Sequence, residues 1–248
     1  MSSASLLSFV RDLKTQNLPA KTLAIFAVPV YSSSDVRIQE KGKATNIRRR
    51  DGDLPCLFAS GLEADKIASF VPSRNLLLKT NFEASRNSFF TSGLNNYRIL
   101  HFAAHTFIND RQPELSSIAL SFYNREGKEI LALLRPNNIL RLSLNADLVV
   151  LIASQSGLGK QIKGEGSVLI GRFFFSAGAH RLIVSLWNVD DKVTTELMSR
   201  FYQKHLVEEK NISISLREAQ LEILPDTRRK TPFYWAAFTL EGDWYKLI

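Results

Sequence analysis

Apolar residues in this 248-residue chain fall into two kinds of pattern, and each predicts its own secondary structure. Short uninterrupted runs rich in Val, Ile, Leu and Phe, bounded by Gly, Pro, Asn or Ser, favour β-strands buried on both faces. Two such runs flank a polar turn at residues 124–127 and predict a hairpin. The predicted strands are 22–29, 75–79, 97–105, 117–123, 129–133, 146–154, 181–187 and 233–240.

Apolar residues that recur every three or four positions between these runs predict helices. The clearest example is the stretch 166–177. Asp190 or Asp191 is expected to cap a helix that extends to about residue 205, and Ser213 or Ser215 to begin another. The other predicted helices are 1–16, 63–70, 82–91 and 136–140. Strands that alternate with helices indicate an α/β fold, with a parallel or mixed sheet covered on both faces.

The length suits one large α/β domain, or a core domain with a smaller amino-terminal lobe. Hydrophobic residues make up 45% and charged residues 23% of the chain, as in ordinary globular proteins. The formal net charge is +8, and part of this excess lies in two basic runs, 41–50 and 228–230. Neither run contains an aromatic residue, so we interpret both as solvated loops and expect no direct nucleic-acid binding.

Several function classes are disfavoured by what the sequence lacks. A single cysteine, Cys56, leaves no partner for an intrachain disulfide or a multi-cysteine metal cluster, and we interpret it as a small buried hydrophobe. No apolar run approaches the roughly 20 residues of a membrane span. No basic segment precedes the first apolar stretch, which argues against a secretory signal. We therefore expect a cytoplasmic protein with no cofactor, no metal and no membrane contact.

Two predicted strands end in residues suited to chemistry. The strand 97–105 ends on His105, and the strand 146–154 ends on Ser154. Reactive groups of open parallel sheets gather beyond the carboxyl ends of the strands, where a base and a hydroxyl or thiol form a nucleophile–base pair. His101 shares the face of His105 but lies about 13 Å away. We expect His101 to be packed and His105 to be exposed, although a lone histidine can also be structural, bonded to a backbone carbonyl.

The loop after Ser154 carries Gly157 and Gly159. These glycines can turn the chain sharply and leave backbone N–H groups to face an oxyanion, or they can form a plain turn. The patterns of a phosphate loop, a dinucleotide-binding turn and an esterase elbow all fail here. Asp190 and Asp191 follow another strand end. Either acid can bind a basic side chain of a substrate, or it can cap the helix that follows.

Several segments of the chain, taken in order, resemble those of the CHAT domain family. The first is His-Phe-Ala-Ala-His at 101–105, and the second is Ala-Asp-Leu-Val-Val-Leu-Ile-Ala-Ser-Gln-Ser-Gly-Leu-Gly at 146–159. Each motif is modest alone, but their ordered series covers nearly the whole chain. The other matching segments are 28–29, 35–37, 61–65, 113–120, 164–166, 177–179, 185–190, 216–220, 235–238 and 242–243.

The resemblance implies a caspase-like three-layer sandwich with a mostly parallel sheet of about six strands, related to separase and gingipain-type peptidases. It implies a variable amino-terminal lobe at residues 1–95 and a catalytic core at 96–248, within one continuous domain. His105 matches the catalytic histidine, and Ser154 stands where the family has its catalytic cysteine. Thr106 stands where the family often has glycine. The backbone N–H groups of Thr106 and Gln155 would hold the oxyanion.

Serine at position 154 changes the expected activity. A cysteine is partly thiolate near neutral pH, whereas a hydroxyl needs a well-placed general base. No acid in the sequence is an obvious third member of a triad, so very slow peptide cleavage or none is expected. Two interpretations stay open. Ser154 is an inactivating replacement in a cysteine endopeptidase, or it is the natural residue of a pseudopeptidase that binds or signals. The expected partners are a peptide or protein substrate and a tetratricopeptide-repeat or other regulatory protein.

Overall fold

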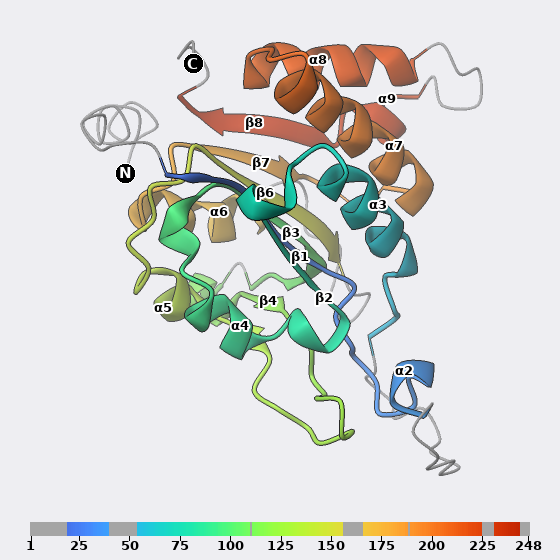
Figure 1. The fold of residues 1–248 in the computed structure, drawn as a ribbon, viewed down its shortest axis with the longest axis vertical. Helices are drawn as coiled ribbons and strands as arrows, with labels where there is room; N and C mark the ends of the chain where they lie inside the picture. The colour runs from blue at the N-terminus through green and yellow to red at the C-terminus, as the bar shows by residue number, and fades with distance from the viewer. Residues whose placement is uncertain are drawn as a thin grey trace.

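The computed structural model describes residues 19–39, 54–109, 111–155, 166–187, 189–224 and 231–243. Eight strands form one sheet in the described part, and six of them follow the order β2-β1-β3-β6-β7-β8 (Figure 1). The strands are β1 Lys21–Ala27, β2 Leu76–Thr80, β3 Tyr97–Phe107, β4 Ser117–Ala119, β5 Leu133–Leu134, β6 Leu148–Gln155, β7 Arg181–Ser185 and β8 Phe238–Gly242. The helices are α2 Val36–Gln39, α3 Phe58–Ala68, α4 Arg86–Thr91, α5 Pro136–Ile139, α6 Gly166–Ser176, α7 Asp191–Tyr202, α8 Ile212–Ile223 and α9 Pro232–Trp235.

The sheet is mostly parallel, as predicted. The pairs β1·β2, β1·β3, β3·β6 and β6·β7 are parallel, and β8 joins the edge of β7 antiparallel. The strands β4 and β5 form an antiparallel extension beside the end of β3. Because β1 lies between β2 and β3, the predicted lobe 1–95 contributes two strands to the same sheet as the core.

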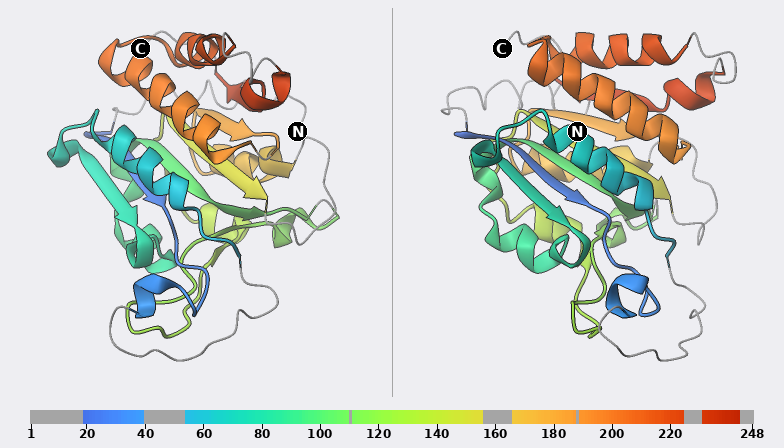
Figure 2. Two further views of the ribbon diagram at one scale, coloured as in Figure 1. Left: turned by 90° about the vertical axis from the view of Figure 1, so that its right-hand side faces the viewer. Right: turned by 45° about the vertical axis from the view of Figure 1, so that its right-hand side comes forward.

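Helices cover both faces of the sheet, which confirms the three-layer sandwich. Alternate residues of β3 point to opposite faces. Leu100 and Phe102 belong to one apolar core together with Phe174 of α6. Ile99 and Ala103 belong to the other core, together with residues of α3, α7 and α8 such as Leu197. Figure 2 shows α3 and α7 in front of the sheet in its left view.

Most predicted elements are present, with corrections to several bounds. The two predicted hairpin strands, 117–123 and 129–133, do pair antiparallel, but only as the short strands β4 and β5. Helix α3 begins at Phe58, five residues before the predicted start. Strand β1 ends at Ala27, because Val28 has a φ of 51° and turns the chain before Pro29. The predicted strand 233–240 is wrong in its first part, since Pro232 opens the short helix α9 and β8 begins only at Phe238. The predicted helix 1–16 lies outside the described residues.

The helix that follows Asp190 is capped as the sequence predicts. The Asp190 carboxylate accepts hydrogen bonds from the backbone N–H groups of Lys192 and Val193 at 3.0 and 3.2 Å. Helix α8 is capped by Asn211, whose side chain accepts from the Ser213 N–H, so neither Ser213 nor Ser215 is the cap. An N-cap must precede the first helical turn, and Ile212 already belongs to it.

Gly178 makes the tight turn from α6 into β7. Its φ is 110°, and a Cβ at this position would lie 2.1 Å from the Leu144 carbonyl oxygen. We expect Gly178→Ala to lower the free energy of unfolding by at least about 2 kcal/mol, because it adds both backbone strain and a clash with a main-chain atom. Denaturant unfolding measures this change. An alanine at Gly61, where the nearest atom is a Val28 side-chain methyl, should be tolerated better.

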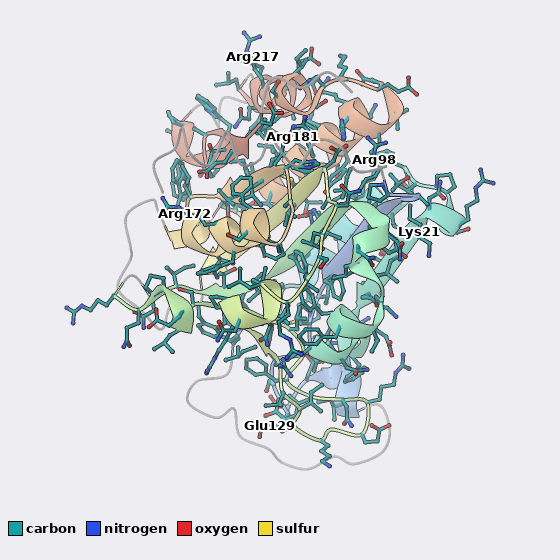
Figure 3. The ribbon with its side chains drawn as sticks, turned by 90° about the vertical axis from the view of Figure 1, so that its left-hand side faces the viewer. Lys21, Arg98, Glu129, Arg172, Arg181 and Arg217 are labelled. Atoms are coloured by element: carbon teal, nitrogen blue, oxygen red, sulfur yellow. The ribbon has the colours of Figure 1, made fainter. Side chains whose placement is uncertain are left out.

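A buried ionic cluster joins the amino-terminal ends of the central strands. Asp147, just before β6, contacts Arg98 of β3 at 3.1 Å and Arg181 of β7 at 3.3 Å. His180 lies 3.6 Å from the same carboxylate. Figure 3 shows Arg98 and Arg181 beside each other at this end of the sheet. The cluster ties three strands together at the end opposite to His105.

Candidate active site

The carboxyl ends of β3 and β6 lie side by side. The two strands pair in parallel from Ile99 to Thr106, and the register places His105 opposite Ser154. The last pair of this ladder is Thr106 with Gln155. Neighbouring strands lie about 4.7–4.9 Å apart. The backbone therefore brings together the two positions that the sequence singles out as base and nucleophile, and the two whose N–H groups it assigns to an oxyanion.

The His105 side chain is held by main-chain and aromatic contacts. Its Nε2 atom lies 2.8 Å from the carbonyl oxygen of Pro55. Its ring lies 4.9 Å from the ring of Tyr31, centroid to centroid. The residue is 2% exposed, so the predicted exposure of His105 is wrong. The reason is that the chain leading into α3 and the amino-terminal Tyr31 both contact the imidazole, and neither contact can be foreseen from the strand alone.

The contact with Pro55 fixes the chemistry of the imidazole. A carbonyl oxygen can only accept, so Nε2 must carry the proton of this hydrogen bond. In the neutral ring, Nδ1 then carries the lone pair and is the basic nitrogen. The sequence contains no obvious acidic third member beside this histidine. The orienting group is instead a backbone carbonyl, which leaves no signal in residue type.

Tyr31 also positions the backbone of His105. The His105 N–H donates to the Tyr31 hydroxyl at 3.0 Å, and this hydroxyl donates to the Ala119 carbonyl at 3.1 Å. Tyr31 is 2% exposed, and burial raises its pKa well above the usual range. The hydroxyl therefore stays protonated at any working pH and links β3 to β4.

Arg37 organises the loop that presents Pro55. Its guanidinium pairs with Asp35 at 2.6 Å and donates to the Val28 carbonyl at 2.9 Å. It also donates to the Cys56 sulfur at 3.2 Å. Cys56 is only half-buried, so its interpretation as a buried hydrophobe needs correction. Burial raises the pKa of the thiol, while the nearby Arg37 charge opposes this effect.

A pocket lies between the ends of β3, β6 and β7 and the helices α3 and α7. Two acids contribute to it, Asp191 of α7 and Glu63 of α3. Burial and the neighbouring Asp190 raise the pKa of Asp191, while His105 lowers it. The structure thus separates the two candidate acids, since Asp190 caps α7 and Asp191 faces the pocket. The pocket is lined by Leu57, Ala59, Ser60, Glu63, Ala103, Ile152, Ser185, Trp187, Val189, Asp191, Thr194 and Phe238.

A buried polar chain lies behind this pocket. Glu63 Oε1 lies 2.9 Å from His101 Nε2, and His101 Nδ1 lies 3.0 Å from the Tyr202 hydroxyl. His101 is fully buried, which confirms its predicted packed role. Burial, together with the Glu63 charge, raises the pKa of Tyr202 well above its usual value. Sequence reasoning missed Glu63 and Tyr202; the available signal was an acid on the apolar face of a helix.

The mostly parallel sheet with helices on both faces defines this chain as a three-layer α/β protein. The family model of the CHAT domain matches residues 1–243, and the chain belongs to this family. The fold is similar to that of part of separase. The Saccharomyces cerevisiae separase–securin crystal structure superposes with a TM-score of 0.51 at 15% identity, covering 97% of this chain and 13% of that one.

Two curated relatives are similar over less than half of the chain. Mouse tetratricopeptide repeat protein 28 is 35% identical over 115 residues, and the human protein of the same name is 33% identical over 115 residues. The matched region is 46% of this chain and 5% of each relative. The chain therefore corresponds to a small part of these larger proteins.

No helix among the described residues is long and apolar enough to cross a membrane. Within the same residues, His, Cys, Asp and Glu side chains form no group of three that could hold a metal ion.

Proposed function

We propose that this chain is a cysteine-type, caspase-like endopeptidase domain whose nucleophile position is occupied by Ser154, so that it cleaves peptide bonds very slowly or not at all as it stands. The observation that carries the proposal is the register of β3 and β6, which pairs His105 with Ser154. The Pro55 carbonyl supports it, because it leaves Nδ1 as the basic nitrogen of His105.

The proposed chemistry follows the roles of these groups. With a thiol at position 154, Nδ1 of His105 would take the thiol proton as sulfur attacks the substrate carbonyl carbon. Backbone N–H groups of Thr106 and Gln155 would hold the oxyanion. The imidazolium would then protonate the leaving amine, and water would hydrolyse the acyl-enzyme. A serine hydroxyl at the same place needs a stronger base than a histidine oriented by a carbonyl provides.

Turnover by Ser154→Cys tests this proposal. The variant is expected to hydrolyse members of a peptide library, whereas the parent chain stays near the uncatalysed rate. A thiol is intrinsically far more nucleophilic than a hydroxyl, so the single replacement of oxygen by sulfur is expected to restore turnover. Background hydrolysis by a folded Ser154→Cys chain would contradict the peptidase assignment.

Asp191 is proposed to bind a basic side chain of the substrate. In the Ser154→Cys background, Asp191→Asn is expected to lower kcat/KM for substrates with Arg or Lys before the scissile bond by about tenfold, or about 1.4 kcal/mol. Substrates with an apolar residue there should change little. Asp190→Asn is the matched control, because Asp190 caps α7. Equal losses for basic and apolar substrates would remove Asp191 from the specificity pocket.

A second function is favoured by the serine itself. A pseudopeptidase would use the same pocket to bind a protein segment without turnover, as one module of a larger assembly. The similarity to proteins named for tetratricopeptide repeats supports this alternative. Its signature would be peptide binding that survives Ser154→Cys without any gain of hydrolysis.

A further inference from the structure

The chain has a second groove, separate from the pocket that Asp191 lines. It runs along the stretch 129–133 and is bordered by Arg86 of α4 and by Arg135 just before α5. Its lining shares no residue with the pocket at the ends of β3 and β6. Figure 3 shows Glu129, which lines one part of this groove, at the base of the molecule.

The stretch 129–134 forms an open sheet edge. Strand β5 pairs only with β4 among the described residues. The Ile130 N–H donates to the Phe122 carbonyl, and the Ala132 carbonyl accepts from the Leu120 N–H. In an antiparallel pair, successive residues direct their N–H and C=O groups to opposite sides. The main-chain groups of Leu131 and Leu133 therefore point away from β4.

The side chains along this edge are unusually apolar for an edge strand. Leu131 is 79% exposed, whereas Ala132 is 6% exposed and Leu134 is fully buried. Open edges in native proteins are normally protected by charged residues, proline or bulges. Here Leu131 is largely presented to solvent and Leu133 is half-buried, and proline appears only at Pro136, after the edge. Such an edge fits a site that is covered when a partner is bound.

The charged side chains beside the edge favour an acidic partner. Within the part of the chain that the structure describes, Arg86 and Arg135 form no ion pair with a carboxylate. The Arg86 guanidinium lies 5.2 Å from the centroid of the Phe90 ring, and Arg135 is exposed. Among the described residues that line the groove, Glu129 is the only acid. Two guanidinium groups against this one carboxylate leave the border of the groove with a net positive charge, which favours a segment that carries carboxylates.

We propose that the 129–134 edge binds an extended segment of another protein, in which aliphatic residues alternate with acidic ones. The segment adds a strand to the 129–134 edge through the main-chain groups of Leu131 and Leu133. Its aliphatic side chains pack on these leucines and on Phe122, and its carboxylates pair with Arg86 and Arg135. This surface shares no lining residue with the pocket of Asp191, so the proposal holds for a peptidase and a pseudopeptidase alike.

The probe is a fluorescein-labelled octapeptide, (Glu-Val)4, titrated with the full chain and followed by fluorescence anisotropy. Saturable binding is expected below about 1 mM, with an affinity that falls at least about tenfold in Arg86→Glu/Arg135→Glu. Arg217→Glu is the matched control, since Arg217 is exposed on α8 at the opposite end of the molecule in Figure 3. It should change the affinity by less than about twofold. Thermal melting of each variant checks that it is folded.

Two further probes separate the strand from simple charge attraction. The peptide (Lys-Val)4 should bind at least about tenfold more weakly, and so should (Glu-Val)4 with N-methyl groups on its valines, because it cannot complete the ladder. The proposal is overturned by no saturable binding, by equal binding of the lysine or N-methylated peptide, or by an unchanged affinity of the double variant. A concentration-dependent dimer that Leu131→Glu dissociates would assign the edge to a second copy instead.

Discussion

Replacing His105 by alanine in a chain that carries Ser154→Cys is expected to lower kcat/KM for peptide hydrolysis by roughly 10²–10⁴-fold. The imidazole is oriented through Nε2 by the Pro55 carbonyl, so its loss removes the proton acceptor beside position 154. Initial rates with the best peptide of the library give this ratio, measured well below the melting temperature of each variant.

The control for this change is another buried histidine. His205 is 6% exposed, stacks on Phe201 and has Nδ1 2.9 Å from the Lys210 carbonyl, so its hydrogen bond resembles that of His105. His205→Ala should reduce stability without reducing kcat/KM. Activity that survives His105→Ala would remove this residue from the proposed chemistry. An equal loss in His205→Ala would show that only folding had been measured.

Asp147→Ala is expected to lower the free energy of unfolding by about 3–5 kcal/mol at pH 7, because it leaves buried cations without their carboxylate. Asp147 is 6% exposed and contacts Arg98, Arg181 and His180. Chemical denaturation measures the change. Glu196→Ala breaks the partly exposed pair with Arg200 and should alter the free energy by less than about 1 kcal/mol. A similar small change for Asp147→Ala would contradict a structural role of the cluster.

The same carboxylate makes stability depend on acid pH. Burial alone would raise the pKa of Asp147, but His180, Arg98 and Arg181 together hold it well below its usual value. Because the pKa of this carboxyl is lower in the folded chain than in the unfolded chain, its ionised form stabilises the fold at pH values above the unfolded pKa of about 3.9. This contribution is lost as pH falls from about 4 toward the folded pKa. Asp147→Asn should therefore show a shallower loss of stability than the parent chain over this acid range.

The sheet could be predicted from the sequence because most of its strands are recognisable from their own residues. The runs that became β3 and β6 are apolar on both faces, as central parallel strands must be, and each ends in a polar residue. Their parallel pairing then follows from the alternation of strands and helices. The positions 105 and 154 could be expected at one edge for this reason, without any knowledge of side-chain contacts.

The surroundings of His105 could not be predicted, because they come from distant parts of the chain. Tyr31 and Pro55 lie 74 and 50 residues before His105, and Pro55 contributes only a main-chain oxygen. These contacts bury the imidazole, so the exposure that strand position alone predicts for His105 is wrong. The start of α3 could not be predicted for a different reason. Phe58 and Leu62 are apolar but exposed, so the apolar residues at the start of the helix do not mark its buried face.

Covalent labelling at position 154 tests the proposed site most directly. The chain Cys56→Ser/Ser154→Cys has a single thiol, because Cys56 is the only cysteine in the parent sequence. Incubation with a peptidyl acyloxymethyl ketone that carries arginine next to the reactive group should add one label by intact mass, mapped to position 154. Adding His105→Ala should slow this labelling at least about tenfold. A folded chain that stays unlabelled, or labels equally fast without His105, would contradict the pairing of imidazole and nucleophile on which the proposed function depends.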